Sequence, residues 1–281
     1  MPANASPVPK PCLLVVGGVT LDLLHLPTGE NAHTPGGAGT YVSLAANHAG
    51  ADVSLFAQRP EPLPPSFQPI AASLNWFGPR ISAKDVPQLE IAHYGGGRAA
   101  LLHAQWGAQR KLSPAQLPSD LSNYAFVHIP PIGTAQKQLE FLRACRARGI
   151  LRVSVGTYSH VVRDEIDVVR QLFREADMFF LNENEANGLF GEGNDPEPDA
   201  RTLTFITLGE RGVRVCVPDQ RPTRILAPRT IERDPTGAGD TFAGATLAHL
   251  LRDSDPIAAA QAGVQAASAM IEHVGTAYFF R

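Results

Sequence analysis

Short apolar runs alternate with longer amphipathic stretches along most of the chain. Residues 12–16 form an apolar run that ends at Gly17 and Gly18, which is typical of a strand buried on both faces of a parallel sheet. Similar runs predict strands at residues 53–57, 125–129, 152–155, 178–181, 204–207 and 213–217. Helical patterns separate most of these runs, and such alternation favours a parallel sheet covered by helices on both faces.

Apolar residues between the strands recur at helical spacing. The glycine-rich run 36–39 precedes a helix of small residues that stops at Gly50. Other helices are predicted from shared faces made by Leu139, Leu142 and Arg146, by Ile166, Val169 and Phe173, and by Ala243, Leu247, Leu250 and Leu251. Asp255 and Pro256 predict the start of a last helix that runs to about His273, because proline fits the first helical position.

A different pattern covers residues 89–106. Two long strands, 89–94 and 99–106, flank a turn of three glycines, and their polar and apolar residues alternate imperfectly. The alternation predicts a half-exposed hairpin outside the core.

Composition and charge limit the classes of partner. The chain has 281 residues, of which 44% are hydrophobic and 18% charged, and its formal charge is -3. This balance indicates a globular protein and gives no reason to expect nucleic acid or an anionic membrane as partner. Residues 1–10 lack an apolar signal core and are expected to form a flexible tail. The three cysteines are far apart, which suits a reducing compartment, so the expected location is cytoplasmic.

Candidate polar residues gather just after the predicted strands. Asp22, the pair Gly36 and Gly37, Asn182, Gly209 and Asp240 all follow such strands. Ligands of open parallel sheets bind beyond the carboxyl ends of the strands. These positions therefore predict one common site.

The stretch 233–242 carries the strongest candidate chemistry. Gly237, Ala238 and Gly239 lie just before or at the start of a helix, where free N–H groups and the helix dipole attract an anion. Asp240 follows them, and a carboxylate there is either a helix cap or a base that accepts a hydroxyl proton. Phosphoryl transfer requires an anion cradle, a base and a cation.

Two further segments suit a nucleotide site and also have plainer interpretations. Asn182 and Glu185 could hold hydrated Mg²⁺ indirectly, or be an ordinary acidic helix start. Residues 207–212 could line a nucleotide, or form only a tight turn between strands. The chain has no Gly-x-x-x-x-Gly-Lys-Ser/Thr motif, and Gly36 to Gly39 do not match Gly-x-Gly-x-x-Gly.

In combination, these motifs resemble the ribokinase-like PfkB family of carbohydrate kinases. The family signature Asp-Thr-x-Gly-Ala-Gly-Asp matches residues 234–240 with proline in second place, and the other motifs follow in family order. The resemblance implies a three-layer α/β/α sandwich with a mostly parallel sheet, as one kinase domain over residues 1–281. It also implies a small lid from about 23–35 and 87–107, built mainly from the second segment.

The resemblance also implies a role for each matching residue. Asp240 would be the catalytic base, with Gly237, Ala238 and Gly239 as the anion hole. ATP and Mg²⁺ would be served by Asn182, Glu185, Thr207, Gly209, Gly212 and Thr236, with Glu185 acting on the metal through water. Asp234 and Thr236 lie where some members hold a monovalent cation such as K⁺. The acceptor would contact Asp22, Gly36, Gly37 and Tyr41.

The departures from the family concern the acceptor. Thr40 and Tyr41 stand where many sugar kinases carry asparagine, and an aromatic residue there is expected to take over part of the acceptor pocket. Residues 57–62 lack the family's Gly-x-Asp, and residues 155–159 replace its Asp-x-Asn-x-Arg. A short chain with tyrosine after Gly-Gly is similar to the inositol-kinase-like branch.

The favoured prediction is an ATP-dependent kinase acting on a hydroxyl of a sugar, polyol or cyclitol. One alternative is the same chemistry on a nucleoside, with Tyr41 or Tyr158 stacking on the base. Another is a catalytically silent member that binds a metabolite. The protein is expected to be a monomer, or a homodimer through the lid.

Overall fold

A computed structural model describes residues 12–197, 200–252 and 255–281. The predicted tail, residues 1–10, lies outside this described part. Among the described residues, no helix has the length and apolar character needed to cross a membrane.

The centre of the molecule is a nine-stranded sheet in the order β15-β14-β13-β12-β11-β10-β1-β4-β6. Its first seven strands along the chain pair in parallel, and β14 and β15 add an antiparallel edge. The strands are β1 Cys12–Val16, β4 Asp52–Phe56, β6 Asn75–Phe77, β10 Tyr124–Ile129, β11 Arg152–Gly156, β12 Met178–Asn182, β13 Leu203–Thr207, β14 Val213–Cys216 and β15 Thr223–Ile225.

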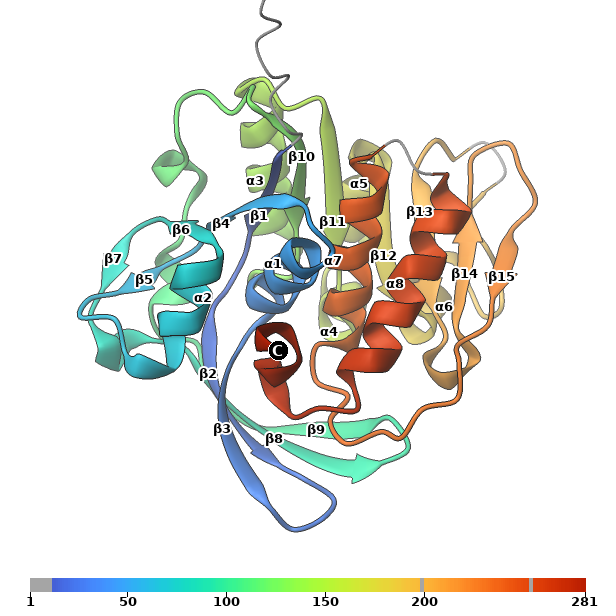
Figure 1. Cartoon of the computed structure of the whole chain (residues 1–281). Helices are drawn as coiled ribbons and strands as arrows, with labels where there is room; N and C mark the ends of the chain where they lie inside the picture. The colour runs from blue at the N-terminus through green and yellow to red at the C-terminus, as the bar shows by residue number, and fades with distance from the viewer. Residues whose placement is uncertain (1–11, 198–199, 253–254) are drawn as a thin grey trace, which may run out of the picture.

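Helices cover both faces of this sheet, as the strand–helix alternation predicted (Figure 1). One face packs α3 Ala135–Ala147, α4 Ser159–Asp164, α5 Ile166–Glu175 and α6 Glu183–Phe190. The other packs α1 Ala38–His48, α2 Gln68–Ser73, α7 Ala238–Leu250 and α8 Pro256–Met270. Each face therefore has its own buried apolar cluster, and the sheet separates the two clusters.

A second sheet has four strands in the order β3-β2-β8-β9, and we call it the lid because it contains both segments predicted to form one. Its strands are β2 Thr20–His25, β3 Asn31–Gly36, β8 Gln88–Gly95 and β9 Arg98–Gln105, and it lies across one end of the molecule (Figure 1). The edge strand β9 exposes Leu101 and Leu102, each 53% accessible. A homodimer through the lid stays a prediction, which this exposed edge would accommodate.

Two local arrangements differ from what the sequence pattern indicated. The polar stretch before Gly36 pairs as a complete hairpin, so the lid has four strands rather than mainly the 89–106 pair. In β2 every second residue is buried, and two of these, Thr20 and Asp22, are polar, which hides the apolar alternation. Between β4 and β8 the chain forms α2, β6 and a small sheet of β5 Arg59–Pro60 and β7 Arg80–Ile81, none of which was predicted.

Short 3-10 helices complete the described chain. They are η1 Pro65–Phe67, η2 Ala83–Asp85, η3 Gly107–Lys111, η4 Pro114–Gln116, η5 Gly209–Arg211 and η6 Gly275–Phe280.

Candidate active site

A cavity of about 380 Å³ lies at the carboxyl ends of the central strands, beneath the lid. This volume is in the range of small-molecule pockets, which is roughly 300–1,000 Å³. We call its two ends the α7 end and the lid end. The α7 end is lined by Asn182, Glu185, Thr207, Gly237, Ala238, Gly239 and Asp240. The lid end is lined by Gly18, Thr20, Gly37, Ala38, Leu89, Trp106 and Gln109.

The start of α7 forms the anion cradle of the α7 end. Gly237 caps the helix with φ +76, and a Cβ on it would lie 2.3 Å from the ring of Tyr41, so only glycine fits. The amide of Ala238 donates to the carbonyl of Pro235 at 3.1 Å. Among the described residues, the amides of Gly239 and Asp240 donate to no backbone carbonyl, which leaves them free for an anion.

Asp240 lies in the first turn of α7, on the cavity wall. The N-cap of α7 is Gly237 and not Asp240, so Asp240 is not the cap residue that the sequence allowed. Burial among protein groups raises the pKa of Asp240 to about 7. A carboxyl that titrates near neutral pH beside an anion cradle has the properties of a general base.

Asn182 and Glu185 form a capping box at the start of α6. The Asn182 side-chain oxygen accepts from the Glu185 amide at 3.0 Å, and Glu185 Oε2 accepts from the Asn182 amide at 2.9 Å. Burial raises the pKa of Glu185 to about 7, against the hydrogen bonds from Asn182 and Ser159 that lower it. The ordinary helix-start interpretation is therefore correct locally, and Glu185 also lines the cavity.

These oxygens suit a hydrated metal better than a directly bound one. Glu185 already accepts hydrogen bonds on both oxygens, and no group of three or more His, Cys, Asp or Glu within the described residues could hold a metal. Mg²⁺ keeps several waters when protein ligands are few, and a single carboxylate can hold it through them.

The lid end was not predicted as such from the sequence. Leu89 comes from β8, while Trp106 and Gln109 follow β9, so the lid strands deliver all three. Gln109 is 6% exposed, and its Oε1 has no partner among the described residues. A buried amide on a cavity wall without a partner can read a polar group of a ligand, because leaving it unpaired costs free energy.

Two predicted acceptor residues, Asp22 and Gly36, lie behind the cavity wall instead of lining it. Asp22 is 1% exposed and accepts a hydrogen bond from Thr20 Oγ1 at 2.5 Å, and burial raises its pKa to about 7. A Cβ on Gly36 would lie 1.8 Å from Asp22 Oδ2, so Gly36 makes room for that carboxyl. Gly37 does line the cavity.

Tyr41 requires a correction. The sequence predicted that it fills part of the acceptor pocket, but its side chain is 1% exposed and packs beneath Gly237 and against Phe279. Tyr41 lies in the first turn of α1, and its side chain is packed between α1 and α7 rather than in the cavity. Tyr158, the other candidate for stacking, lines the cavity and donates through its hydroxyl to the carbonyl of Gly133 at 2.7 Å.

The remaining predicted residues separate into two groups. Thr207 lines the cavity, whereas Gly209 and Gly212 shape the turn beyond it and do not. Asp234 and Thr236 also lie off the cavity, where Asp234 is fully buried and its carboxylate accepts from the Thr236 amide at 2.9 Å.

His128 is a cavity residue that no motif indicated. It lies on β10, and its Nδ1 is 2.8 Å from Ser154 Oγ on the neighbouring strand. Burial lowers the pKa of His128 to about 3, so the ring is neutral at ordinary pH. A single histidine inside an apolar strand run carries no sequence signal that separates it from a core residue.

Comparison with known proteins identifies the family of the chain. A family model described as pfkB family carbohydrate kinase matches residues 104–280. The cytidine kinase of Thermococcus kodakarensis is 29% identical over 246 residues, which cover 84% of this chain and 87% of that protein.

Solved structures agree with the fold. A probable sugar kinase protein from Rhizobium etli CFN 42 superposes with a TM-score of 0.83 at 17% identity, over 96% of this chain and 95% of its own. The adenosine kinase from Sinorhizobium meliloti superposes with a TM-score of 0.82 at 18% identity, over 95% of each chain. The predicted three-layer α/β sandwich of ribokinase type is confirmed.

Proposed function

Since the chain belongs to the pfkB family of carbohydrate kinases, which transfer phosphoryl groups to hydroxyl acceptors, we propose that it moves the γ-phosphoryl group of ATP to a hydroxyl of a nucleoside. The observation that carries this proposal is the single cavity that joins a base and an anion cradle to an apolar, lid-built end. The named relative is a cytidine kinase, which points to the same class of acceptor.

At the α7 end, Asp240 accepts the proton of the attacking hydroxyl. The hydroxyl oxygen attacks the γ-phosphorus in line as the bond to the ADP oxygen breaks. The free amides of Gly239 and Asp240 stabilise the negative charge that builds on the phosphoryl oxygens, aided by the positive end of the α7 dipole. The raised pKa of Asp240 makes it a stronger base than an ordinary aspartate.

The donor side of the cavity serves the nucleotide. Asn182 and Glu185 lie where bound Mg²⁺ would be held through its waters, and the ion would supply positive charge to the phosphates. Thr207 lines the same wall and is a candidate contact for ATP. The capping box keeps Asn182 and Glu185 in fixed positions before any ligand binds.

The lid end suits a nucleobase better than a second set of hydroxyls. Leu89 and Trp106 offer an apolar wall and an indole ring, on which a planar base can stack. Gln109 offers both a donor and an acceptor, which can pair with the polar edge of a base.

A sugar, polyol or cyclitol acceptor, the class favoured from the sequence alone, is the second candidate. Thr20 lines the lid end with Asp22 bonded directly behind it, and such a pair can hold acceptor hydroxyls. The argument for an inositol-like acceptor has weakened, because it rested on Tyr41 and that side chain lies outside the cavity. The catalytically silent alternative is the least supported, since base, cradle and Glu185 all face one cavity.

An ADP-release screen tests the proposal. Nucleosides, the matching free pentose, hexoses and inositols are compared under the same ATP concentration, with and without a chelator of Mg²⁺. We expect nucleosides to show roughly 10- to 100-fold higher kcat/KM than the free pentose, because base stacking contributes about 1–3 kcal/mol. Activity should stop with the chelator. Faster turnover of a hexose or inositol than of every nucleoside would replace the first candidate with the second.

A further inference from the structure

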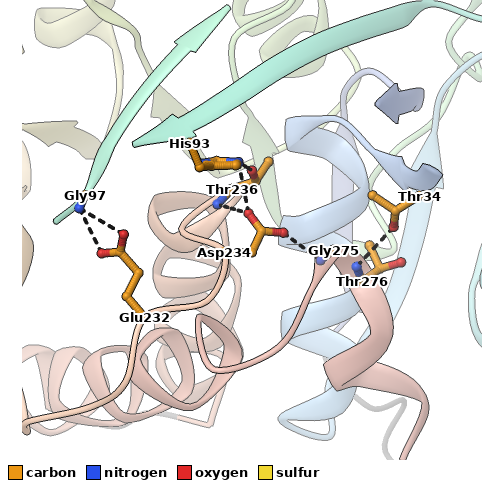
Figure 2. Close-up of polar contacts among 8 residues, drawn as sticks. All are labelled: Thr34, His93, Gly97, Glu232, Asp234, Thr236, Gly275 and Thr276. Atoms are coloured by element: carbon orange, nitrogen blue, oxygen red, sulfur yellow. Dashed lines mark hydrogen bonds and ion pairs between the residues drawn. The ribbon is translucent and has the colours of Figure 1, made fainter. Parts of the chain in front are cut away.

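The lid touches the loop that leads into α7 at two points (Figure 2). At the tip of the lid hairpin, the amide of Gly97 donates to both carboxylate oxygens of Glu232, at 3.0 and 2.9 Å. Further along β8, His93 Nε2 lies 2.9 Å from Thr236 Oγ1 and 3.3 Å from Asp234 Oδ1. The His93 side chain is 1% exposed and Asp234 is fully buried, so the second contact excludes water.

Asp234 is the centre of this contact. Its Oδ1 accepts from the Thr236 amide at 2.9 Å, and its Oδ2 accepts from the Gly275 amide at 2.7 Å. The neighbouring Thr276 amide donates to Thr34 Oγ1 of lid strand β3 at 3.4 Å (Figure 2). The lid, the loop before α7 and the C-terminal turn therefore meet around one buried carboxylate.

The contacts favour a proton on Nε2 of His93. Its neighbours Asp234 Oδ1 and Thr236 Oγ1 are both oxygens that can accept a hydrogen bond from Nε2. Nδ1 has no partner within the described part of the chain, which is the less costly arrangement when Nδ1 carries no proton. His93 thus supplies a positive N–H dipole to a carboxylate that would otherwise be buried with only two donors.

This arrangement does not fit the monovalent cation that the family resemblance implied at Asp234 and Thr236. A hard cation needs several oxygen ligands directed at it. Here both carboxylate oxygens of Asp234 already face N–H groups, from Thr236, Gly275 and His93, and each N–H dipole would repel a cation. The donor set neutralises the carboxylate without a metal ion.

The same lid strand also lines the cavity. Leu89 lies four residues before His93 on β8 and forms part of the lid end, whereas Thr236 directly precedes Gly237 and the anion cradle. One strand therefore connects the wall that would face the acceptor with the loop that positions the free amides of Gly239 and Asp240.

We propose that His93 is a positioning residue for phosphoryl transfer, which holds the loop before the anion cradle from the lid and takes the place of a monovalent cation there. This inference rests on the proposed kinase function for its activity readout. His93 does not touch the reacting atoms. It acts through Asp234 and Thr236 on the orientation of the cradle amides, and transition-state stabilisation is sensitive to that orientation.

Three variants of the full chain test the proposal. His93→Ala removes the ring, and His93→Gln restores a donor, because the glutamine amide nitrogen reaches the position of Nε2. His103→Ala is the matched control, since His103 is an exposed histidine on lid strand β9. Each is assayed for kcat and KM in K⁺ and in a salt of a bulky organic cation.

We expect wild-type activity to differ by less than about twofold between the two salts, and His93→Ala to lose roughly 10-fold in kcat with a smaller change in KM. His93→Gln should recover to within about threefold of wild type, and His103→Ala should match wild type. A wild type that depends on K⁺, or a folded His93→Ala variant with unchanged kcat, would overturn the proposal. If His93→Ala does not fold, Thr236→Val replaces it, because it removes the other partner of Nε2 and should lower kcat in the same direction.

A binding measurement separates this inference from the proposed function. In the proposed function the cradle binds the terminal phosphate of ATP, which ADP lacks, so calorimetry should show that His93→Ala weakens ATP binding several-fold more than ADP binding. This ratio needs no acceptor. A shifted ratio together with no phosphorylated acceptor would reject the proposed function and keep the role of His93, whereas active wild type with an unshifted ratio in His93→Ala would do the reverse.

Discussion

The α7 end and the lid end of the cavity are built in different ways. The α7 end combines the first turns of two core helices, α6 and α7, with residues at the ends of β12 and β13. The lid end takes Leu89 from β8, which is mostly half-buried, and Trp106 and Gln109 from just after β9, whose side chains are largely exposed. One end is held by the sheet and its helices, and the other by a sheet of four strands with an open edge.

Because of this difference, the α7 end can be recognised from a sequence motif and the lid end cannot. Free helix amides and a nearby carboxylate require glycine and aspartate at fixed spacing, so the α7 end appears in the sequence as a motif. A wall that stacks on a ring requires only an aromatic or aliphatic side chain at the right depth, which many sequences provide. The chemistry should therefore depend on the α7 end, and the choice of acceptor on the lid end.

The largest effect should come from the α7 end. Asp240→Asn keeps the shape of the side chain but removes its capacity to accept a proton, so we expect kcat to fall by roughly 10²–10⁴-fold. ATP affinity should change little, because the cradle amides stay in place. Steady-state kinetics and calorimetry measure the two quantities.

The matched control for this prediction is Asp167→Asn. Asp167 also lies in the first turn of a helix, α5, but its side chain is exposed and pairs with Arg170. It should keep wild-type kcat. An Asp240→Asn variant with activity near that of the control would show that Asp240 is not the general base. The reaction could then not be assigned to the α7 end.

A smaller effect is expected at the lid end. Trp106→Ala should raise the acceptor KM by roughly 10- to 100-fold, as the loss of about 1–3 kcal/mol of stacking predicts, with the KM of ATP unchanged. Trp106→Phe should restore most of the loss, since it keeps an aromatic face. Equal increases in both KM values would show that the two ends are not separable, which would break the comparison.

The smallest effect concerns stability and again distinguishes the ends. The pKa of Asp240 is raised to about 7, so its ionisation opposes folding: stability is highest below the unfolded pKa near 4 and declines as pH rises toward 7. Asp22 and Glu185 contribute in the same direction. We expect Tm to fall by roughly 5 °C between about pH 6.5 and pH 8, and by less in Asp240→Asn.

The buried His128 limits the pH range of the thermal-melting measurement. The pKa of His128 is lowered to about 3, so protonation of the unfolded chain reduces stability below about pH 6.5 and restricts the useful window to higher pH. Trp106→Ala carries no titrating group and should keep the wild-type slope. An Asp240→Asn variant with an unchanged slope would contradict the burial of that carboxyl.

Much of the core could be predicted because its determinants are local. Short apolar runs correspond to β1, β10 and β12, and Asp255 with Pro256 begins α8 as expected. The hairpin that contains β2 could not be recognised, because its buried positions include Asp22, whose partner Thr20 makes burial tolerable. That compensation depends on contacts that no periodicity reveals.

In the site, too, the residues fixed by local structure could be predicted, and those fixed by distant contacts could not. Asn182, Glu185, Thr207 and the residues at the start of α7 line the cavity, because strand ends and helix starts determine where they lie. Tyr41 was placed wrongly because its position after Gly36 and Gly37 says nothing about which side of α1 it occupies. Gln109 escaped notice because a lone glutamine after a strand belongs to no motif, and His93 because its partner Thr236 is far away in the sequence.

The contact between Tyr41 and Gly237 has a consequence for how this enzyme can change. Beside the ring of Tyr41 only glycine fits at position 237, so a larger residue there would require a smaller one at position 41. This contact joins α1 to α7 independently of the lid strands. Grafting a foreign lid onto this chain should exchange the acceptor, and the alignment of donor and base should survive where the graft keeps His93 and its contacts with Asp234 and Thr236.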